Sequence, residues 1–390
     1  MRLRFSDEDE QFRTELLAWL EQNPPPDAEE AAEPARSSAD QRPWAQRWQR
    51  TLFDAGYLVP GWPPERGGRN ATPVQQMIYF EELTKRKIRR TTNPQGLSII
   101  TPTLIDHGTP EQIERFALPT LRAEISWCLG MSEPNAGSDL ASLATRAVLD
   151  GDRFIVNGQK VWTSGAQHAD WCICFVRTDP EAPKHKGISV LLIDMRTPGV
   201  EHRPIPELTD HDYADFNEVF FTDVEVPAEN LVGQLNDGWR LAGGSLGHER
   251  AMLWIDYAHD QQEILEKLVA LAKQRGSDER TRDLIATAAI DAQALLALGY
   301  RGFSKFVKGQ PSSEHTILKL FGSETLQRSL LVGAEELGAD VIDLDLDAPA
   351  VWREGSWGTQ YLRSFAATIP GGTSEIQRNI IAERVLGLPR

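Results

Sequence analysis

The sequence predicts an α+β protein built of three parts: a helical domain over residues 1–125, a β domain over 126–235 and a helical bundle over 236–390. Apolar residues recur at helical spacing in the first and last parts, whereas the middle part consists of short β-branched and aromatic runs separated by turn residues. The length of 390 residues agrees, because a domain holds roughly 150 residues and two or three domains are therefore expected.

The first part is predicted to form helices interrupted by one long loop. Its helical periodicity is carried by large apolar side chains at Phe12, Leu16, Leu17 and Leu20 and, more loosely, at Ile78, Phe80 and Leu83. Three consecutive prolines at 24–26 and the acidic run after them cannot lie inside a helix. We therefore expect a surface loop or flexible segment from about Asn23 to Pro43.

The middle part is predicted to be an antiparallel barrel or sandwich. Candidate strands lie at 147–149, 153–156, 161–162, 171–177, 187–194 and 218–224. The dipeptide Asn157-Gly158 separates two of these runs and is a strong signal for a hairpin turn. No helical pattern lies between the strands to cross over a parallel sheet, so neighbouring strands should run antiparallel.

The last part is predicted to be a four-helix bundle with a short terminal helix. Apolar residues recur at bundle spacing, as at Ile264, Leu268 and Leu271. Helix-terminating residues cluster at 276–278, 310–313 and 343–349. These clusters divide the part into about four long helices and one short one.

Composition and charge exclude several classes of protein. The chain carries 41 Lys and Arg against 57 Asp and Glu, a formal net charge of −16, which disfavours binding to nucleic acid. Its apolar runs are far shorter than the ~20 residues of a membrane helix, and acidic residues stand where a signal peptide would be apolar. We therefore expect a cytoplasmic protein that binds neither nucleic acid nor membranes.

The cysteine pattern indicates a reducing compartment and no metal site. Three cysteines, Cys128, Cys172 and Cys174, are too few and odd in number for a disulfide framework. Strand alternation places Cys172 and Cys174 on one face, but zinc sites prefer longer spacings and usually four ligands. Buried small side chains are the better interpretation, and we assign no metal.

Two common kinds of active site are not supported. Gly243–Gly247 is rich in glycine, but no strand precedes it and it lacks the spacing of a dinucleotide-binding loop. The G-x-S-x-G motif of serine hydrolases does not occur. We therefore expect neither a Rossmann or P-loop nucleotide site nor serine-hydrolase chemistry.

Two polar segments carry more information. Gly130–Asp139 is dense in hydroxyls, carboxylates and glycines and can offer backbone N–H groups to an anion or a flavin edge. Lys160–Ser164 places a tryptophan beside two hydroxyls at a strand end, which suits a flat heteroaromatic cofactor. Taken separately, the two segments are also compatible with a plain turn and an interface tryptophan.

Taken together, the two segments resemble the acyl-CoA dehydrogenase family. Gly130–Asp139 satisfies every element of the family signature, and Lys160–Ser164 matches its Lys-x-Trp-x-[Ser/Thr] strand end. Glu218–Gly233 resembles the strand that enters the family's C-terminal bundle, and Gly371–Leu388 resembles its last loop and helix. The resemblance covers essentially the whole chain, and it implies the family's fold and an FAD-dependent oxidoreductase.

The resemblance implies a flavin site in the middle part. Met131 and Ser132 would hydrogen-bond the pyrimidine side of the flavin. Ser138 would lie near the phosphate and CoA end. Trp162 and Ser164 would cover the isoalloxazine ring and bond its N5 side.

Further cofactor contacts are implied in the last part. Thr373 and Glu375 would approach the flavin nucleotide, and Arg275 occupies the arginine position of the family's adenosine contact. Ser374 and Gln377 have capping-box spacing, which would aim a helix N-terminus at a phosphate-bearing ligand.

The resemblance places the catalytic base at Glu249. In one branch of the family the base lies in the terminal loop just before Gly-Thr, where this chain has Gly371 and no side chain. In the branch that includes isovaleryl-CoA dehydrogenase, the base comes from the first bundle helix and precedes an arginine, as Glu249 precedes Arg250. Arg250 and Ser138 would then contact the substrate.

Helical periodicity independently marks Glu249. It belongs to a stripe spaced four, three and four residues apart: Ala242, Leu246, Glu249 and Leu253. A carboxylate on an apolar stripe is costly unless it is paired or functional, and burial raises its pKa towards that of a useful base. The alternative is a buried salt bridge with another element, because Arg250 faces elsewhere.

Two departures from the family pattern concern assembly. Homomeric members hold the adenosine half of FAD through Arg-x-x-Phe and Gln-x-x-Gly-Gly of a neighbouring subunit. Here Asp278 stands in place of the phenylalanine, and Glu335 and Ala339 replace the glutamine and the second glycine. Heteromeric members divide such parts between two related chains, which favours a heterotetramer.

The sequence thus predicts an FAD-dependent acyl-CoA dehydrogenase that forms the α,β (trans-2-enoyl) double bond of an acyl-CoA thioester. Electrons would pass to an electron-transfer flavoprotein. The alternative is a non-catalytic or half-site partner subunit of a heteromeric dehydrogenase. The acyl group stays open between short branched, long straight, and steroid or other ring-bearing chains.

Overall fold

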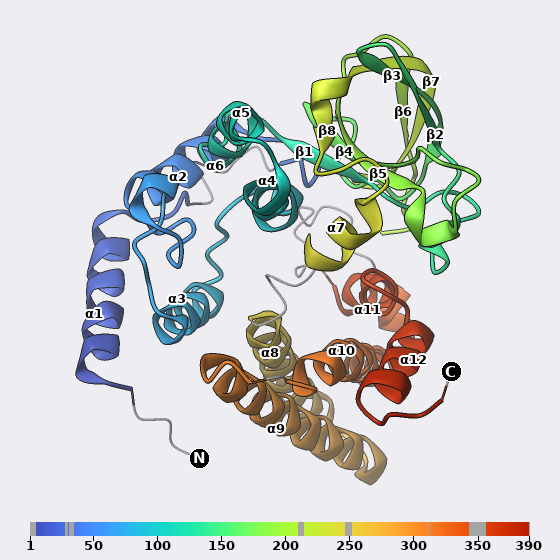
Figure 1. Ribbon diagram of the computed structural model, residues 1–390. Helices are drawn as coiled ribbons and strands as arrows, with labels where there is room; N and C mark the ends of the chain where they lie inside the picture. Colours follow the sequence, from blue (N-terminus) through green and yellow to red (C-terminus); the bar gives the residue numbers. More distant parts are fainter. Residues whose placement is uncertain are drawn as a thin grey trace. The chain divides into compact units, whose positions relative to one another are not determined.

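A computed structural model describes residues 5–27, 30, 35–209, 214–245, 252–310, 312–342 and 356–389. The chain forms two compact units, whose helices and strands are labelled in Figure 1. The first unit comprises Met1–Thr72 and Arg89–His248, and the second comprises Pro73–Ile88 and Glu249–Arg390. One early segment of the chain therefore packs with the C-terminal helices.

Helices precede the sheet in the first unit. They are α1 (Asp7–Gln22), α2 (Pro43–Asp54), α4 (Thr101–His107), α5 (Pro110–Gln112) and α6 (Leu118–Leu121), with short 3₁₀ or π turns at Pro64–Arg66, Gly96–Ile100 and Ile113–Ala117. Ser6 caps α1, and the predicted periodic residues Phe12, Leu16 and Leu20 are buried. The predicted loop begins where α1 ends, and the chain is helical again from Pro43.

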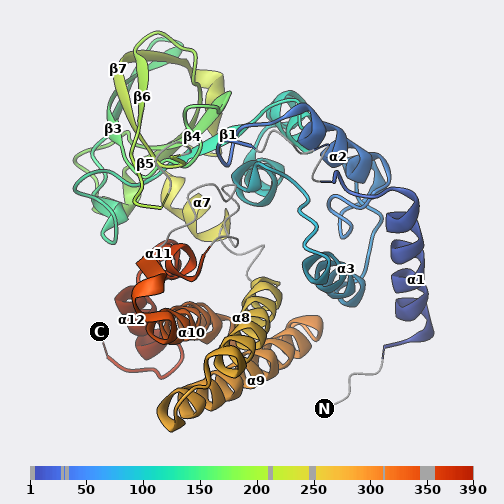
Figure 2. The same cartoon turned by 180° about the vertical axis from the view of Figure 1, so that it is seen from behind.

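The middle of the chain forms one curled eight-stranded sheet (Figures 1 and 2). Its strands are β1 (Trp127–Gly130), β2 (Arg146–Asp150), β3 (Arg153–Lys160), β4 (Trp171–Arg177), β5 (Ile188–Asp194), β6 (Val200–Pro204), β7 (Asn217–Pro227) and β8 (Leu231–Val232). The order is β6-β7-β3-β2-β4-β5-β8, with β1 paired to β4. Most pairs are antiparallel, as predicted, but β4 pairs in parallel with β1 and, at Arg146 and Arg177, with β2. The β2–β3 hairpin, rather than a helix, lies in the connection between β1 and β4.

The hairpin predicted at Asn157-Gly158 is wrong. The chain turns at Gly151 between β2 and β3, and the dipeptide lies inside β3, where the register with β7 shifts between Val156 and Gly158. A Cβ at Gly158 would lie 2.6 Å from the Cα of Thr145, so glycine serves close packing at a bulge. β3 therefore continues to Lys160, and residues 161–162 are not a strand.

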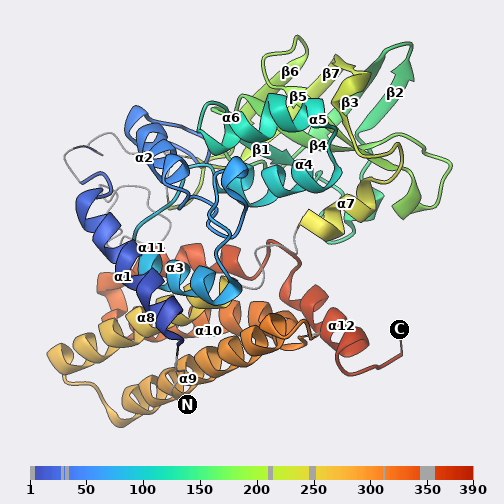
Figure 3. The same cartoon turned by 60° about the vertical axis from the view of Figure 1, so that its left-hand side comes forward.

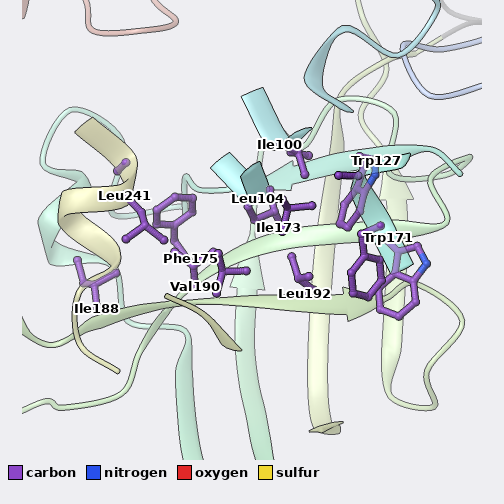
Figure 4. Close-up of a cluster of buried hydrophobic side chains, with 14 of the residues drawn as sticks. Ile100, Leu104, Trp127, Trp171, Ile173, Phe175, Ile188, Val190, Leu192 and Leu241 are labelled. Atoms are coloured by element: carbon purple, nitrogen blue, oxygen red, sulfur yellow. The ribbon is translucent and has the colours of Figure 1, made fainter. Parts of the chain in front are cut away.

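A buried apolar cluster fixes the sheet to the helices beside it (Figure 4). Trp127 and Trp171 lie at one end of the cluster, and Phe175, Ile188 and Leu241 lie at the other. Leu241 belongs to α7 (Gly238–Ser245). The cluster therefore holds β1 and the start of α7 against β4 and β5.

The three cysteines belong to a second buried cluster of the β domain. Cys128, Cys172 and Cys174 are each 0% exposed. Hydrogen bonding to Cys128 raises the pKa of the Cys172 thiol, and burial raises the pKa of Cys174. Within the described ranges, no group of three or more His, Cys, Asp or Glu side chains could hold a metal ion. The thiols act as small apolar side chains, as predicted.

The second unit is a helical bundle. It contains α3 (Pro73–Lys85), α8 (Leu253–Arg275), α9 (Glu279–Val307), α10 (Glu314–Leu337), α11 (Trp357–Ala367) and α12 (Ser374–Arg384). Helices α8, α9 and α10 pack against one another, and α11 and α12 pack against α10 (Figure 3). The first two predicted breaks are confirmed between α8 and α9 and between α9 and α10, whereas the third lies outside the described residues.

Helix α9 is long and apolar enough to cross a membrane by length and composition. It packs, however, against α8 and α10 as a member of the bundle. Only 22% of its most apolar stretch is buried inside this chain, and Ile290 is 70% exposed. α9 therefore presents apolar surface that the described chain does not cover.

Candidate active site

The side chain of Glu133 shapes the loop Gly130–Asp139. β1 leads into this loop, and Glu133 and Ala136 exchange two backbone hydrogen bonds of 3.0 Å, which fold the loop back on itself. The Glu133 carboxylate accepts hydrogen bonds from the backbone N–H groups of Ala144 at 2.6 Å and Thr145 at 2.9 Å. The loop is therefore a fixed turn, and Ser138 is exposed on it.

A buried ion pair joins this loop to the end of β3. Lys160 is fully buried, and its Nζ donates to Glu133 Oε1 at 2.8 Å and to the Met131 carbonyl at 3.1 Å. The N–H of Val161 donates to the Ser132 carbonyl at 2.9 Å. Burial raises the pKa of Glu133, but the Lys160 charge and the hydrogen bonds outweigh burial and hold this pKa below its ordinary value. The two segments predicted to share one cofactor are therefore in direct contact.

Trp162 presents an exposed ring from a strained backbone. Its φ is +60°, and 60% of the residue is exposed. The ring meets Phe216 edge-on, with 5.8 Å between ring centroids. A left-handed backbone costs a bulky residue on the order of 1 kcal/mol or more, and such strain clusters at binding sites. The next residue, Thr163, anchors this conformation by donating its N–H to the Asn217 carbonyl at 3.0 Å.

The donor groups around Trp162 fit the edge of a flavin. Ser132 and Ser164 are half-buried, and their hydroxyl groups have no hydrogen-bond partner within the part of the chain that the structure describes. The buried Oγ1 of Thr163 also lacks a partner there. An exposed indole beside free hydroxyl groups suits a flat ring with hydrogen-bonding edges, as FAD would bring.

In the second unit, Thr373 and Glu375 lie at the start of α12. Thr373 is the N-cap, because its side chain accepts a hydrogen bond from the Ile376 N–H at 3.3 Å. The predicted cap at Ser374 is therefore wrong by one residue. Thr373 has the extended backbone that a cap requires, whereas Ser374 is the first residue of the helix and is buried.

Both residues line a pocket of about 440 Å³ in the second unit. Arg328 and Arg378 line the same pocket together with Glu324 and Glu375, and Arg378 forms ion pairs with both glutamates. Lys319 fixes the loop before α12, since its Nζ donates to the Gly372 carbonyl at 2.7 Å. The N-terminus of α12 opens into this pocket and suits an anionic group, whereas the charges of the two arginines are paired with carboxylates.

Arg275 is engaged within its own chain. Its guanidinium forms an ion pair with Asp340 and donates to the carbonyls of Glu336 and Leu337, each at 3.4 Å. These partners lie at the end of α10 and in the turn after it. The arginine at the position of the adenosine contact therefore ties α8 to α10 in this chain.

The residues that depart from the family pattern also have internal partners. Asp278 is the N-cap of α9 and accepts a hydrogen bond from the Thr281 N–H at 2.8 Å. Glu335 forms an ion pair with Arg280 at 3.4 Å. Asp278 therefore caps a helix at this end of the bundle, Glu335 makes an exposed ion pair there, and both place negative charge at this end.

Two predicted site residues, Glu249 and Arg250, lie outside the described residues. The apolar stripe predicted around Glu249 is described only at its ends. Ala242 is buried in α7, and Leu253 is the first residue of α8. The position of the base therefore stays a prediction.

The pairing of Lys160 with Glu133 is the main feature that sequence reasoning missed, although both residues lie inside the two predicted flavin segments. One feature of the sequence could have indicated this ion pair. Phe154, Val156 and Lys160 are the buried positions of β3, so a lysine stands where the strand presents an apolar side chain. A buried lysine needs a buried anion.

Comparisons with known proteins identify the family. Three family models match consecutive parts of the chain: acyl-CoA dehydrogenase N-terminal domain over residues 6–124, middle domain over 128–224 and C-terminal domain over 236–386. The chain is 37% identical to "Acyl-CoA dehydrogenase IpdE1" of Mycobacterium tuberculosis over 386 residues, 98% of each protein. It is 40% identical to "Acyl-CoA dehydrogenase FadE34" of the same organism over 348 residues, 88% of this chain but 46% of that protein. The chain thus spans about half the length of this second relative.

Solved structures agree with the family in fold. The structure named "Tcur3481-Tcur3483 steroid ACAD" matches with a TM-score of 0.82 and 29% identity, covering 100% of both chains. The "ChsE4-ChsE5 complex from Mycobacterium tuberculosis" matches with a TM-score of 0.81 and 29% identity, also covering 100% of both. The predicted fold class and family are therefore confirmed. The chain belongs to the acyl-CoA dehydrogenase family and is an oxidoreductase of that family.

Proposed function

We propose that the chain is an FAD-dependent dehydrogenase that forms the α,β double bond of an acyl-CoA thioester. The observation that carries this proposal is the direct contact between the loop Gly130–Asp139 and the end of β3. Met131 and Ser132 would hold the pyrimidine side of the flavin, and Trp162 and Ser164 would cover its ring and bond near N5. Bound there, FAD would accept a hydride from the β-carbon of the substrate at N5.

The other roles follow from the family resemblance. Glu249 would take the α-proton, which the thioester carbonyl makes acidic. Ser138 and Arg250 would contact the substrate, and Thr373 and Glu375 would contact the flavin nucleotide. Electrons would leave to an electron-transfer flavoprotein. Because one similar structure is named a steroid ACAD, we propose a ring-bearing acyl group, which a panel of acyl-CoA thioesters with an artificial electron acceptor would test.

Replacing Trp162 with alanine should weaken flavin binding by about tenfold without unfolding the chain, because a stacked ring is lost while the exposed residue contributes little to the core. The measurement is the flavin absorbance that remains after dialysis, with circular dichroism to follow folding. Phe220→Ala, which removes another aromatic ring of the β domain, is the control. Unchanged flavin content in the Trp162 variant would contradict the proposed site.

We also propose that the chain works in a complex with a related chain. Arg275, Asp278 and Glu335, which stand at the adenosine-contact positions, are occupied by contacts inside this chain. Glu335 would also turn negative charge towards a pyrophosphate, where the family has an amide donor. The uncovered apolar surface of α9 offers area that a partner would bury. One similar structure, ChsE4-ChsE5, is itself a complex of two named components.

Co-expression with related chains should yield a mixed oligomer with fewer flavins than chains, because this chain would supply no intact adenosine contact to a neighbour. Mass measurement of the assembly and the flavin-to-protein ratio check this expectation. A homotetramer with one tightly held FAD per chain would show that the substituted residues are compensated. A colourless isolated chain that gains flavin and activity only with its partner would favour the alternative of a half-site subunit.

A further inference from the structure

Residues 162–169, which follow β3, form a strap that carries the exposed ring of Trp162. Two residues of the strap have a left-handed backbone, Trp162 with a φ of +60° and Gly165 with a φ of +71°. The strap folds back on itself, because the N–H groups of His168 and Ala169 donate to the Gly165 carbonyl at 2.9 and 3.0 Å. A bulky residue with a left-handed backbone persists only where the surrounding structure holds it.

Asn217, the first residue of β7, binds the strap with both its backbone and its side chain. It is 0% exposed. Its carbonyl accepts the Thr163 N–H at 3.0 Å, and its Nδ2 donates to the Thr163 carbonyl at 3.2 Å. The same Nδ2 donates to the side chain of Gln167 and, at 3.0 Å, to the carbonyl of Asp215. One buried asparagine therefore holds both backbone groups of the residue that follows Trp162.

Asp215 ties the strap to the segment 37–39 of the first helical part. It is 8% exposed, and its carbonyl accepts the Gly165 N–H at 2.8 Å. Its carboxylate accepts hydrogen bonds from the N–H of Ser38 at 2.7 Å and from the hydroxyl of Ser38 at 3.1 Å. Within the described residues, no lysine or arginine pairs with this carboxylate. A buried carboxylate is costly unless donors satisfy it, so the position of Asp215 depends on the two Ser38 groups.

The segment 37–39 also contacts the strap directly. The Oγ of Ser37 lies 3.0 Å from the Nδ1 of His168, with a hydrogen bond between them. A Cβ at Gly165 would lie 2.7 Å from the Cβ of Ala39, so glycine allows the segment and the strap to pack this closely. The strap is therefore held by two separate parts of the chain.

We propose that Asp215 and Asn217 are positioning residues that hold the strap in the conformation that binds flavin, an inference that rests on the proposed function. Neither residue would touch the cofactor. Phe216 stands between them in the sequence and meets the Trp162 ring edge-on, so three consecutive residues contact the strap. With these contacts in place, the indole ring and the Ser164 hydroxyl are fixed before flavin binds. Less conformational entropy is then lost on binding.

The first test is a double-mutant cycle on FAD binding by the full chain in its purified assembly. Asn217→Ala should weaken FAD binding by about five- to tenfold, because the strap then samples other conformations. Asn217 would act through Trp162, so the double variant N217A/W162A should bind FAD within about threefold of W162A alone.

Asn230→Ala is the matched control for Asn217→Ala. Asn230 is another buried asparagine of the β domain, 3% exposed, and its Nδ2 donates to the Leu192 carbonyl at 2.9 Å. Its loss removes a comparable buried hydrogen bond away from the strap. The control variant should lose stability but keep the wild-type affinity for FAD.

Two variants of Asp215 test the link to Ser38. Asp215→Ala should weaken FAD binding more than Asp215→Asn does, because the amide keeps one oxygen acceptor for the Ser38 groups. Wild-type affinity for FAD in Asp215→Ala would overturn the positioning role of this residue.

Hydrogen exchange measures the strap itself. In N217A the amides of residues 162–169 should exchange about three- to tenfold faster, whereas those of β4 and β5 should keep wild-type rates. W162A controls for the loss of flavin, because it weakens flavin binding and leaves the Asn217 hydrogen bonds in place. Strap exchange in N217A that is no faster than in W162A would overturn the inference.

Failure of the inference can be told apart from failure of the proposed function. If W162A lowers the affinity for FAD and N217A does not, the positioning role is wrong and the proposed flavin site stands. Additive losses in the double variant would also overturn the positioning role, because Asn217 would then act independently of Trp162. If W162A itself leaves FAD binding unchanged, the proposed flavin site is wrong, and the positioning role is wrong with it.

Discussion

Replacing Glu249 with glutamine should lower turnover by about 10²- to 10⁴-fold while flavin content and folding stay intact. The amide has nearly the shape of the carboxyl group but cannot take the α-proton. Steady-state turnover with an artificial acceptor and single-turnover bleaching of the flavin measure the loss. Activity within about tenfold of wild type would place the base elsewhere.

A carboxylate restored at Gly371 in this variant gives a sharper test. A Cβ at Gly371 would meet nothing within 4 Å, although its φ of +67° strains any side chain. Gly387 is a matched control, because it has the same φ of +67° and equally open surroundings. Partial recovery with Gly371→Glu, and none with Gly387→Glu, would show that both base positions of the family reach the same α-carbon in this chain.

Replacing Lys160 with methionine should have the largest effect on stability. The change leaves the Glu133 carboxylate, which is 9% exposed, without its cation, and such a loss typically costs about 3–5 kcal/mol of unfolding free energy. The Met131 carbonyl loses its hydrogen-bond donor at the same time, so bound flavin should fall as well. Denaturant unfolding and flavin content are the two measurements.

The second variant for this pair is Lys160→Met combined with Glu133→Gln. Removing both charges should recover part of the stability, whereas flavin binding should stay weak because the loop has lost its link to β3.

The pKa of Glu133 is lower in the folded chain than its ordinary value, so the contribution of Glu133 to stability is present above that ordinary value and is lost as pH falls through the folded pKa. Lys160→Met should flatten this acid dependence. Wild-type unfolding behaviour in the Lys160→Met variant would contradict a stabilising role of the Lys160–Glu133 ion pair.

The two segments proposed to bind flavin could be recognised in the sequence because each is short and continuous. Residue types and order were sufficient to propose Met131, Ser132, Trp162 and Ser164 as flavin contacts. What holds these residues together was not predictable, since Lys160 lies 27 positions from its partner in the loop. A lysine in a strand indicates that a buried anion is needed, but it does not identify which one.

The features that the sequence did not indicate also arise from contacts between distant residues. Asn157-Gly158 is a good turn signal, but Thr145 of a neighbouring segment approaches so closely that glycine is needed within the strand. The loose apolar pattern of α3 does not say which helices it joins, and α3 packs with the bundle. The sequence indicates only a lost adenosine contact at Asp278, whereas the structure gives this residue a role as the cap of α9.

Because all three thiols lie buried in the β domain, their reactivity reports whether that domain opens. A thiol reagent has no accessible target while that domain is closed, because each cysteine is 0% exposed and the pKa values of Cys172 and Cys174 are raised. The rate of labelling therefore measures opening of the β domain alone, separately from unfolding of the helical bundle. A cysteine placed on the surface of either unit would then carry a fluorophore or spin label selectively, with the three native cysteines left in place.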